Sequence, residues 1–270
     1  MADDEDTALD ERRLMGEERD RTVAYVASSL GLTRVEIAGD QIGRFSLVHR
    51  GRTTSVAGGG GKLVAGTEED VLLGTGEEFV ATEFGPAEAV GLADGRPMAV
   101  GPSGDVARLV GDDWETVGSV VGPSRMDGDL LAASDGVYRV GNDLTPLGGE
   151  AVRDVAAAGP YAATAAGLAC YDDGWQQEWA GDCTLVAARG DRVHAICGGA
   201  LLERADGEWA VGDCPADAPL AGLAHGESLY AVTADGTFYV RAAPDITPDG
   251  RGGWRSRSLG VPDVVGLAVP

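Results

Sequence analysis

The chain has 270 residues, of which 44% are hydrophobic and 42 are glycine, and its 44 acidic and 21 basic side chains give a formal charge of −23. This composition allows a packed core with many tight turns and excludes a chain that is disordered throughout. It offers no clustered basic face for nucleic acid, and no run approaches the ~18 consecutive apolar residues of a membrane span. We therefore expect neither nucleic acid nor membrane as a partner.

Residues 1–21 form an acidic stretch with nine carboxylates and four arginines. This stretch lacks the basic start and the apolar centre of a signal peptide, so we expect a solvated, flexible tail. Residues 22–270 are predicted to form a single domain. A cytoplasmic location follows, in which the four cysteines should be thiols.

From residue 28 onward, a tight turn followed by an alternating apolar run recurs seven times, at intervals of 31 to 39 residues. The turn residues are Gly31, Asp70, Asp105, Gly136, Gly167, Ala200 and Gly236. A large apolar residue opens another short run after each turn, and these anchors are Phe45, Phe79, Trp114, Leu144, Trp175, Trp209 and Trp254. The turn residues and the apolar anchors recur with the same period, which indicates one unit copied seven times.

A run of small residues leads most copies, as in "SVAGG" (55–59), "AVGLAD" (89–94) and "DVAAAG" (154–159), while the fourth copy, "PSRMDGD" (123–129), is degenerate. Each copy thus holds about four short strands, the arrangement of a β-propeller blade. Small residues suit the innermost strand, where the blades converge. The pattern predicts an all-β, seven-bladed β-propeller of four-stranded blades.

The two ends of the repeat complement each other. The chain finishes on "VVGLAVP" (264–270), an innermost strand with no hairpin after it, whereas the first copy, "TVAYVASSLGLTRV" (22–35), has no innermost strand before it. We expect the C-terminal strand to pair with the N-terminal blade and close the ring, which removes open sheet edges.

The segment "TVAYVASSLGLTRVEIAGDQIGRFSLVHRG" (22–51), with its Gly-Asp-x-x-Gly-x-Phe step, resembles the opening of a haloarchaeal β-propeller family that has no assigned activity. The resemblance extends from about residue 22 to the end, and it implies a fold and a lineage but no catalytic residues. Lys62 is the single lysine beside twenty arginines. Such acidity with almost no lysine resembles proteins of salt-in halophilic archaea, in which acidic surface serves solubility at molar salt.

Alignment of the innermost strands places Arg153 and Asp263 at one level near the mouth of the central channel, with Arg125 and Asp154 close by. Two interpretations remain open. These residues form a structural ion pair, or they form a site for an anion or a carbonyl group. Arg125, Arg153, Asp154 and Asp263 are therefore the candidate ligand-binding residues, and no residue is assigned as catalytic.

Three further sets of residues have side chains that could serve in a metal or catalytic site. Carboxylates at the hairpins, Asp70, Asp105, Asp135 and Asp235, suit tight turns without any further role. "GDC" occurs at 181–183 and 212–214, and Cys197 lies on the hairpin between these two segments. Cys183, Cys197 and Cys214 are therefore weak metal candidates, but their spacings match no zinc pattern. His49, His194 and His225 fall on different blades and are read as ordinary side chains. No cofactor is expected.

The leading hypothesis is a non-enzymatic binding or assembly platform, monomeric, for an unknown protein or small molecule. Its main support is that no catalytic set converges in the sequence. The alternative is a propeller hydrolase or lactonase with a metal-assisted site at the channel mouth. A cation that touches two or more of Asp70, Asp105, Asp135, Asp154, Asp235 and Asp263 would favour this alternative.

Overall fold

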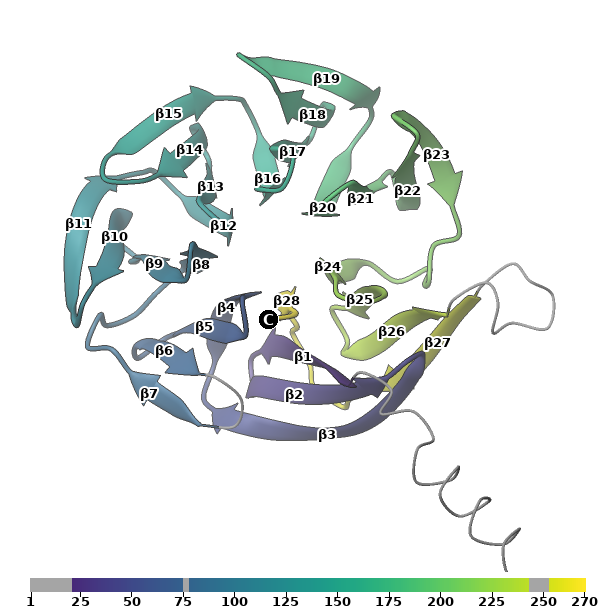
Figure 1. Ribbon diagram of the computed structural model, residues 1–270, viewed down its shortest axis with the longest axis horizontal. Helices are drawn as coiled ribbons and strands as arrows, with labels where there is room; N and C mark the ends of the chain where they lie inside the picture. The colour runs from purple at the N-terminus through teal and green to yellow at the C-terminus, as the bar shows by residue number, and fades with distance from the viewer. Residues whose placement is uncertain (1–20, 75–77, 243–252) are drawn as a thin grey trace, which may run out of the picture.

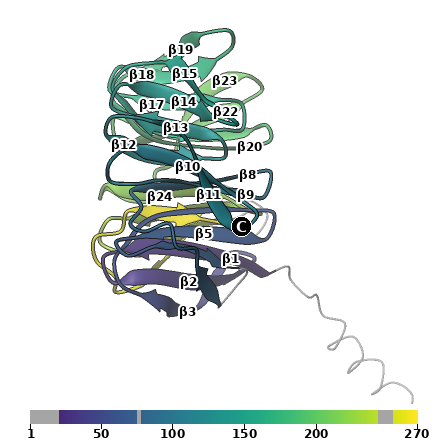
Figure 2. The ribbon, with the colours of Figure 1, turned by 90° about the vertical axis from the view of Figure 1, so that its left-hand side faces the viewer.

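A computed structural model describes residues 21–74, 78–242 and 253–270 of the chain; residues 1–20 of the predicted tail lie outside this part. The described residues form 28 strands in seven antiparallel sheets of four. The sheets are arranged as blades around a central axis (Figure 1), and from the side the ring is a disc (Figure 2). The prediction of a seven-bladed, all-β propeller is confirmed.

The first four blades take the strands in chain order, except that the last strand of the chain joins the first blade. Blade 1 holds β28 (Gly266–Ala268), β1 (Arg21–Ser28), β2 (Gly31–Ala38) and β3 (Gln41–Arg50). Blade 2 holds β4 (Thr53–Gly59), β5 (Lys62–Thr67), β6 (Val71–Gly74) and β7 (Phe79–Ala81). Blade 3 holds β8 (Ala89–Ala93), β9 (Arg96–Val100), β10 (Asp105–Val110) and β11 (Asp113–Ser119). Blade 4 holds β12 (Pro123–Asp127), β13 (Leu130–Ala133), β14 (Gly136–Val140) and β15 (Leu144–Gly148).

The remaining blades follow the same order from the centre outward. Blade 5 holds β16 (Val152–Ala156), β17 (Tyr161–Thr164), β18 (Gly167–Tyr171) and β19 (Trp175–Ala180). Blade 6 holds β20 (Cys183–Arg189), β21 (Arg192–Cys197), β22 (Ala200–Ala205) and β23 (Glu208–Gly212). Blade 7 holds β24 (Leu220–His225), β25 (Leu229–Thr233), β26 (Thr237–Ala242) and β27 (Gly253–Ser258). Among the described residues, none belongs to a helix that could span a membrane.

The disc has an upper and a lower face. The upper face carries the hairpins between the second and third strands of each blade. The lower face carries the turns from each innermost strand to the second strand. Glycine is required at several upper hairpins: Gly236 has a φ of +84°, and a Cβ atom there would lie 2.1 Å from the carbonyl oxygen of Val261. The glycine at this turn thus reflects a hairpin that packs tightly against the segment following the outermost strand of its blade.

The ring closes as the repeat predicts. β28 pairs antiparallel with β1 through Tyr25 and Ala268, Val26 and Leu267, and Ala27 and Gly266. The backbone N–H of Val265 also donates to the Ala27 carbonyl at 2.9 Å. Val264 and Ala268 are buried in the core clusters on either side of this sheet. Two segments at opposite ends of the chain therefore form one blade (Figure 1).

The anchor residues lie on the outermost strands and tie neighbouring blades together. Each of four tryptophan indoles donates a hydrogen bond to the preceding blade: Trp114 to the Thr82 carbonyl, Trp175 to the Leu147 carbonyl, Trp209 to the Glu178 carboxylate and Trp254 to the Asp213 carbonyl, at 2.8 to 3.2 Å. At the seam between blades 7 and 1, Arg257 instead lies over the Phe45 ring and donates to the carbonyls of Ile42 and Gly43. At the outer rim, neighbouring blades are thus connected by hydrogen bonds as well as by packing.

Removal of residues 264–270 should open the ring, because β1 would lose its inner partner and two blade interfaces would lose buried apolar side chains. A fully buried apolar side chain contributes about 1.5–3 kcal/mol, against a total margin of about 5–15 kcal/mol for a domain. We expect aggregation or a non-cooperative thermal transition by circular dichroism. Removal of residues 1–20 is the control and should leave a cooperative transition. A soluble, cooperatively folding chain that ends at Asp263 would contradict the closure.

Trp175→Phe should destabilise the protein by about 1 kcal/mol more than Trp179→Phe in urea unfolding, since a buried hydrogen bond contributes about that much. The Trp175 indole donates to the Leu147 carbonyl at 3.1 Å, whereas the Trp179 indole has no hydrogen-bond partner among the residues that the structure describes. Both side chains are half-buried on β19, so the loss of ring area is matched. Equal effects of the two substitutions would show that the indole bond does not stabilise the rim.

Candidate functional site

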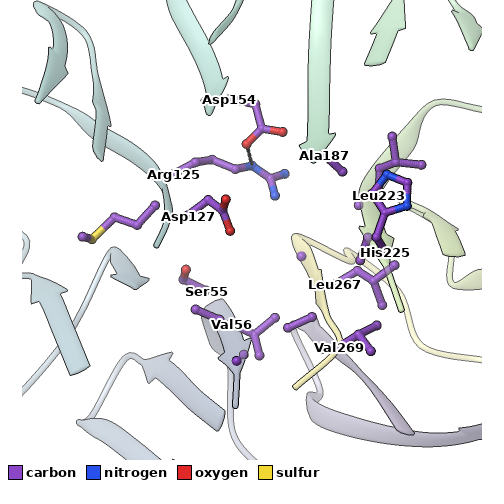
Figure 3. A pocket seen from close by; sticks show the side chains of 18 of the residues that line it. Ser55, Val56, Arg125, Asp127, Asp154, Ala187, Leu223, His225, Leu267 and Val269 are labelled. Carbon is purple, nitrogen blue, oxygen red and sulfur yellow. Dashed lines mark ion pairs between the residues drawn. The ribbon is translucent and has the colours of Figure 1, made fainter. Parts of the chain in front are cut away.

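The innermost strands surround a central cavity of about 580 Å³, the channel cavity, which extends toward the lower face. Its walls come from β4, β12, β16, β20, β24 and β28. Most of these strands contribute small residues that let them approach the axis, whereas β12 contributes Ser124, Arg125, Met126 and Asp127. Charged side chains enter this cavity from two neighbouring blades (Figure 3). Arg125 and Asp127 extend from β12, and Asp154 extends from β16.

Arg125 crosses the channel. Its Nη2 donates to the carbonyl oxygen of Ala221 on β24 at 2.9 Å, which connects blade 4 with blade 7. Its Nε lies 3.9 Å from Oδ1 of Asp154, the ion pair that Figure 3 marks. The guanidinium is therefore held between a main-chain carbonyl and a carboxylate.

Asp154 is a buried carboxylate, with 8% of the residue exposed. Its Oδ2 accepts a hydrogen bond from the Val186 N–H of the next blade at 2.9 Å. Burial raises the pKa of Asp154 to about 6, although Arg125 and the Val186 amide favour the charged form. The carboxyl group can therefore carry or release a proton near neutral pH.

Asp127 faces the water of the channel while the cavity walls surround it. Its Oδ2 accepts a hydrogen bond from the Ala157 N–H of blade 5 at 2.7 Å, and its other oxygen has no hydrogen-bond partner among the described residues. Burial raises the pKa of Asp127, and repulsion from Asp129 adds to the shift. Asp127 thus offers an oxygen with acceptor capacity inside the cavity.

The structure brings together two of the four residues that the sequence nominated. Arg125 and Asp154 line the channel cavity, whereas Arg153 and Asp263 do not. Arg153 pairs with Asp182 at 2.6 Å, and Asp263 accepts a hydrogen bond from the Ser29 hydroxyl at 3.1 Å. Arg153 is the unpaired residue where the register of β16 and β17 shifts between Val152 and Asp154, and its guanidinium binds Asp182 instead of entering the cavity.

Sequence reasoning missed Asp127, although the same period of two would have placed it beside Arg125. It also missed that two histidines meet. Nδ1 of His194 on β21 lies 3.2 Å from Nε2 of His225 on β24, which lines the channel cavity. Burial lowers the pKa of His194 to about 4 and that of His225 to about 3, so both rings are neutral at pH 7. His49 lies apart, on β3.

The hairpin carboxylates are each engaged within their own blade. Asp70 accepts hydrogen bonds from the backbone N–H groups of Val71, Phe84 and Gly85 through one oxygen and from that of Glu83 through the other. The side chains of Asp105, Asp135 and Asp235 bond to Ser103, Tyr138 and Thr233. Within the described part of the chain, no three His, Cys, Asp or Glu side chains are grouped for a metal ion.

The expectation of four thiols is wrong for two of the cysteines. Cys183 and Cys197 form a disulfide between β20 and β21. They stand directly opposite each other in the register, with Cα atoms 3.9 Å apart, so a separation of 14 residues becomes a contact once the strands pair. Cys170 and Cys214 are free, and the Cys214 sulfur donates to the Ala216 carbonyl. Cys183, Cys197 and Cys214 are therefore not three thiolates in this structure.

The family model described as "Beta-prop_HVO_0234:-like, beta propeller" matches residues 8–270. No curated protein matches the sequence. Similar solved structures include the computationally designed Ika8 protein, with a TM-score of 0.58, 16% identity, and coverage of 91% of this chain and 86% of that chain. YCF48 bound to D1 peptide gives a TM-score of 0.55 at 13% identity, covering 76% and 81%. AztD from Citrobacter koseri gives a TM-score of 0.53 at 8% identity, covering 90% and 82%. These likenesses show the fold alone.

Replacement of Asp154 by Asn should change how stability depends on pH. The pKa of the folded carboxyl, about 6, lies above the value of about 3.9 in an unfolded chain. Folding therefore takes up a proton between these values, and the wild type loses stability as the pH rises from about 4 through 6, with the loss levelling off about one pH unit above the folded pKa. The free energy of unfolding of Asp154→Asn, relative to that of the wild type, should increase by about 1 kcal/mol between pH 5 and pH 6 in urea unfolding at constant KCl.

In this measurement the buried histidines contribute equally to both proteins and cancel in the difference. Asp182→Asn removes one exposed negative charge and controls for the change in net charge. A difference between Asp154→Asn and the wild type that stays constant from pH 5 to pH 7 would contradict the raised pKa.

Proposed function

We propose that this chain, which belongs to the HVO_0234-like β-propeller family, is a non-catalytic ligand-binding propeller whose channel cavity holds a small polar molecule. The observation that carries the proposal is the charged group inside the cavity: Arg125, Asp127 and Asp154 converge there from two blades. A volume of about 580 Å³ falls in the range of about 300–1,000 Å³ that small-molecule sites occupy.

The charges in the cavity favour a ligand with polar groups of its own. Asp127 is exposed to the channel cavity, so an oxygen that the protein leaves free is available to a ligand. Arg125 and Asp154 partly compensate each other, but one oxygen of Asp127 has no hydrogen-bond partner among the described residues. A ligand that donates a hydrogen bond or carries a positive group beside Asp127 would satisfy that oxygen.

A small molecule is favoured over a protein partner because the exposed apolar side chains do not gather. The exposed large apolar residues of the described part are spread over blades 1, 2, 3 and 6 or the loops beside them: Leu30, Leu47, Val80, Val110, Val121 and Val211. A protein interface would place such side chains in one patch.

Binding is favoured over the hydrolase alternative because of where the carboxylates lie. A shared cation would require two of the nominated carboxylates to face each other. Asp70, Asp105, Asp135 and Asp235 instead bond within separate blades, and Asp263 bonds to Ser29. Asp154 is the nominated carboxylate that lines the channel cavity.

We further propose that the protein works as a monomer in the cytoplasm of a salt-in halophilic archaeon. The formal charge of −23 and the single lysine, Lys62, support this setting. At ~1 M salt the Debye length is ~3 Å, so recognition there depends on contacts inside a cavity more than on the long-range field of the acidic surface.

The experiment is native mass spectrometry of the protein purified from a halophilic host in ~1 M ammonium acetate, followed by chromatography of the extracted small molecules. We expect a bound small molecule in the wild type and in Asp105→Asn, a matched change on the upper face. Asp127→Asn, whose amide oxygen can still accept the Ala157 N–H, should retain less than a tenth of it. If the wild type carries no small molecule and none from a host extract raises its melting temperature, the proposal fails. Turnover of the bound molecule would favour the hydrolase.

A further inference from the structure

Most cations of this acidic chain have a carboxylate partner, but those without one gather on one face. The described arginines with a carboxylate oxygen within 4 Å are Arg34, Arg44, Arg52, Arg108, Arg125, Arg139, Arg153, Arg204, Arg241 and Arg255. Within the same described ranges, the cations without one are Arg21, Arg50, Lys62, Arg96, Arg189, Arg192 and Arg257.

Strand direction places five of these seven on the lower face. Arg21, Lys62, Arg96 and Arg192 begin β1, β5, β9 and β21, and Arg189 ends β20. Arg50 and Arg257 lie toward the upper ends of β3 and β27. The chain has about two acidic side chains for each basic one. Five cations on one face without a carboxylate partner are therefore a distinct feature of its surface.

Two of these arginines line a second cavity of about 380 Å³, which we call the antechamber. It adjoins the channel cavity, with which it shares Gly61, Arg189, Val269 and Pro270. Arg21, Arg34 and Arg189 line it, and Glu227 is the one acidic residue among its lining residues. Arg34 is paired with Glu36 at 2.6 Å, and the charge of Arg21 also acts on this carboxylate, so Arg189 is the lining arginine whose positive charge is least compensated.

The walls of the antechamber hold Arg189 in place. Its Nη1 donates to the His225 carbonyl at 3.1 Å, which leaves the other N–H groups of the guanidinium for a ligand. Arg192 donates to the carbonyls of Gly226 and Glu227 at 2.6 and 3.2 Å and fixes the turn that forms the adjoining wall. A guanidinium that one backbone carbonyl orients at the edge of a cavity is suited to bidentate binding of a carboxylate or phosphate group through its remaining N–H groups.

We propose that the antechamber binds an oxyanion group, carboxylate or phosphate, through Arg189 and Arg21, and that this group is one end of the ligand in the channel cavity. The assignment rests on the proposed function. Asp127 and Asp154 disfavour a negative group deeper in the channel, so the oxyanion stays at the antechamber. The other end of the ligand, which points toward Asp127, carries a positive or hydrogen-bond-donating group.

The antechamber is tested with inorganic phosphate as the probe, by equilibrium dialysis of labelled phosphate in KCl at constant ionic strength. The wild type and Arg50→Gln, which removes an arginine without a carboxylate partner near the upper face, should bind phosphate with equal affinity. Arg189→Gln and Arg21→Gln should each bind at least tenfold more weakly. Arg21 begins β1 and its side chain has no hydrogen bond among the described residues, so Arg21→Gln remains informative if Arg189→Gln loses stability.

Absence of phosphate binding in the wild type, or equal binding in all four proteins, would overturn the antechamber assignment. The small molecule that co-purifies with the protein separates the two proposals. Loss of that molecule in Asp127→Asn but not in Arg189→Gln or Arg21→Gln would refute the antechamber alone. Phosphate binding that depends on Arg189 and Arg21, in a protein that carries no channel ligand, would refute the proposed function and the assignment of the oxyanion to that ligand.

Discussion

The pairing of β28 with β1 is the constraint on which the rest of the structure depends. Every blade presents an innermost strand to the axis, and a ring of such strands leaves no blade with an open flank. In blade 1 that strand comes from the far end of the chain. The channel cavity exists because this last strand completes the wall between β24 and β4, whose residues line it together with those of β28.

The side chains that hold the blades together near the axis are also those that give the cavity its chemistry. Ser55, Asp127 and Asp154 each accept a hydrogen bond from a backbone N–H of the next blade, at Val90, Ala157 and Val186. In two of these three bonds the acceptor is a carboxylate inside the ring, where burial raises the pKa of Asp127 and Asp154. Arg125 then compensates part of this charge and spans the ring to Ala221.

The fold was predictable because the same short sequence features recur in each blade. Gly136 and Gly236 at the hairpins and Trp175 and Trp254 on the outer strands reveal the blade without any knowledge of the ring. The site was less predictable because it depends on contacts between blades. Asp154 and Arg125 were found from strand level alone, but the direction in which Arg153 points was not.

Contacts between neighbouring blades and across paired strands were missed for the same reason. His194 and His225 sit on different blades, and only the rotation from one blade to the next brings their rings within 3.2 Å. Cys183 and Cys197 looked like separate loop residues until the register of β20 and β21 placed them opposite each other. Arg21 and Arg189 are far apart in sequence and lie on blades 1 and 6, and the closure of the ring lets both of them line the antechamber.

Native-state hydrogen exchange at Val265–Ala268 tests the closure most directly, since an ordinary chain end frays while a closing strand cannot open alone. If β28 seals the ring, its hydrogen-bonded amides, including the Val265 N–H bound to the Ala27 carbonyl, should exchange with the free energy of global unfolding. Rapid exchange of these amides, at a rate independent of global stability, would contradict a ring held by its last strand.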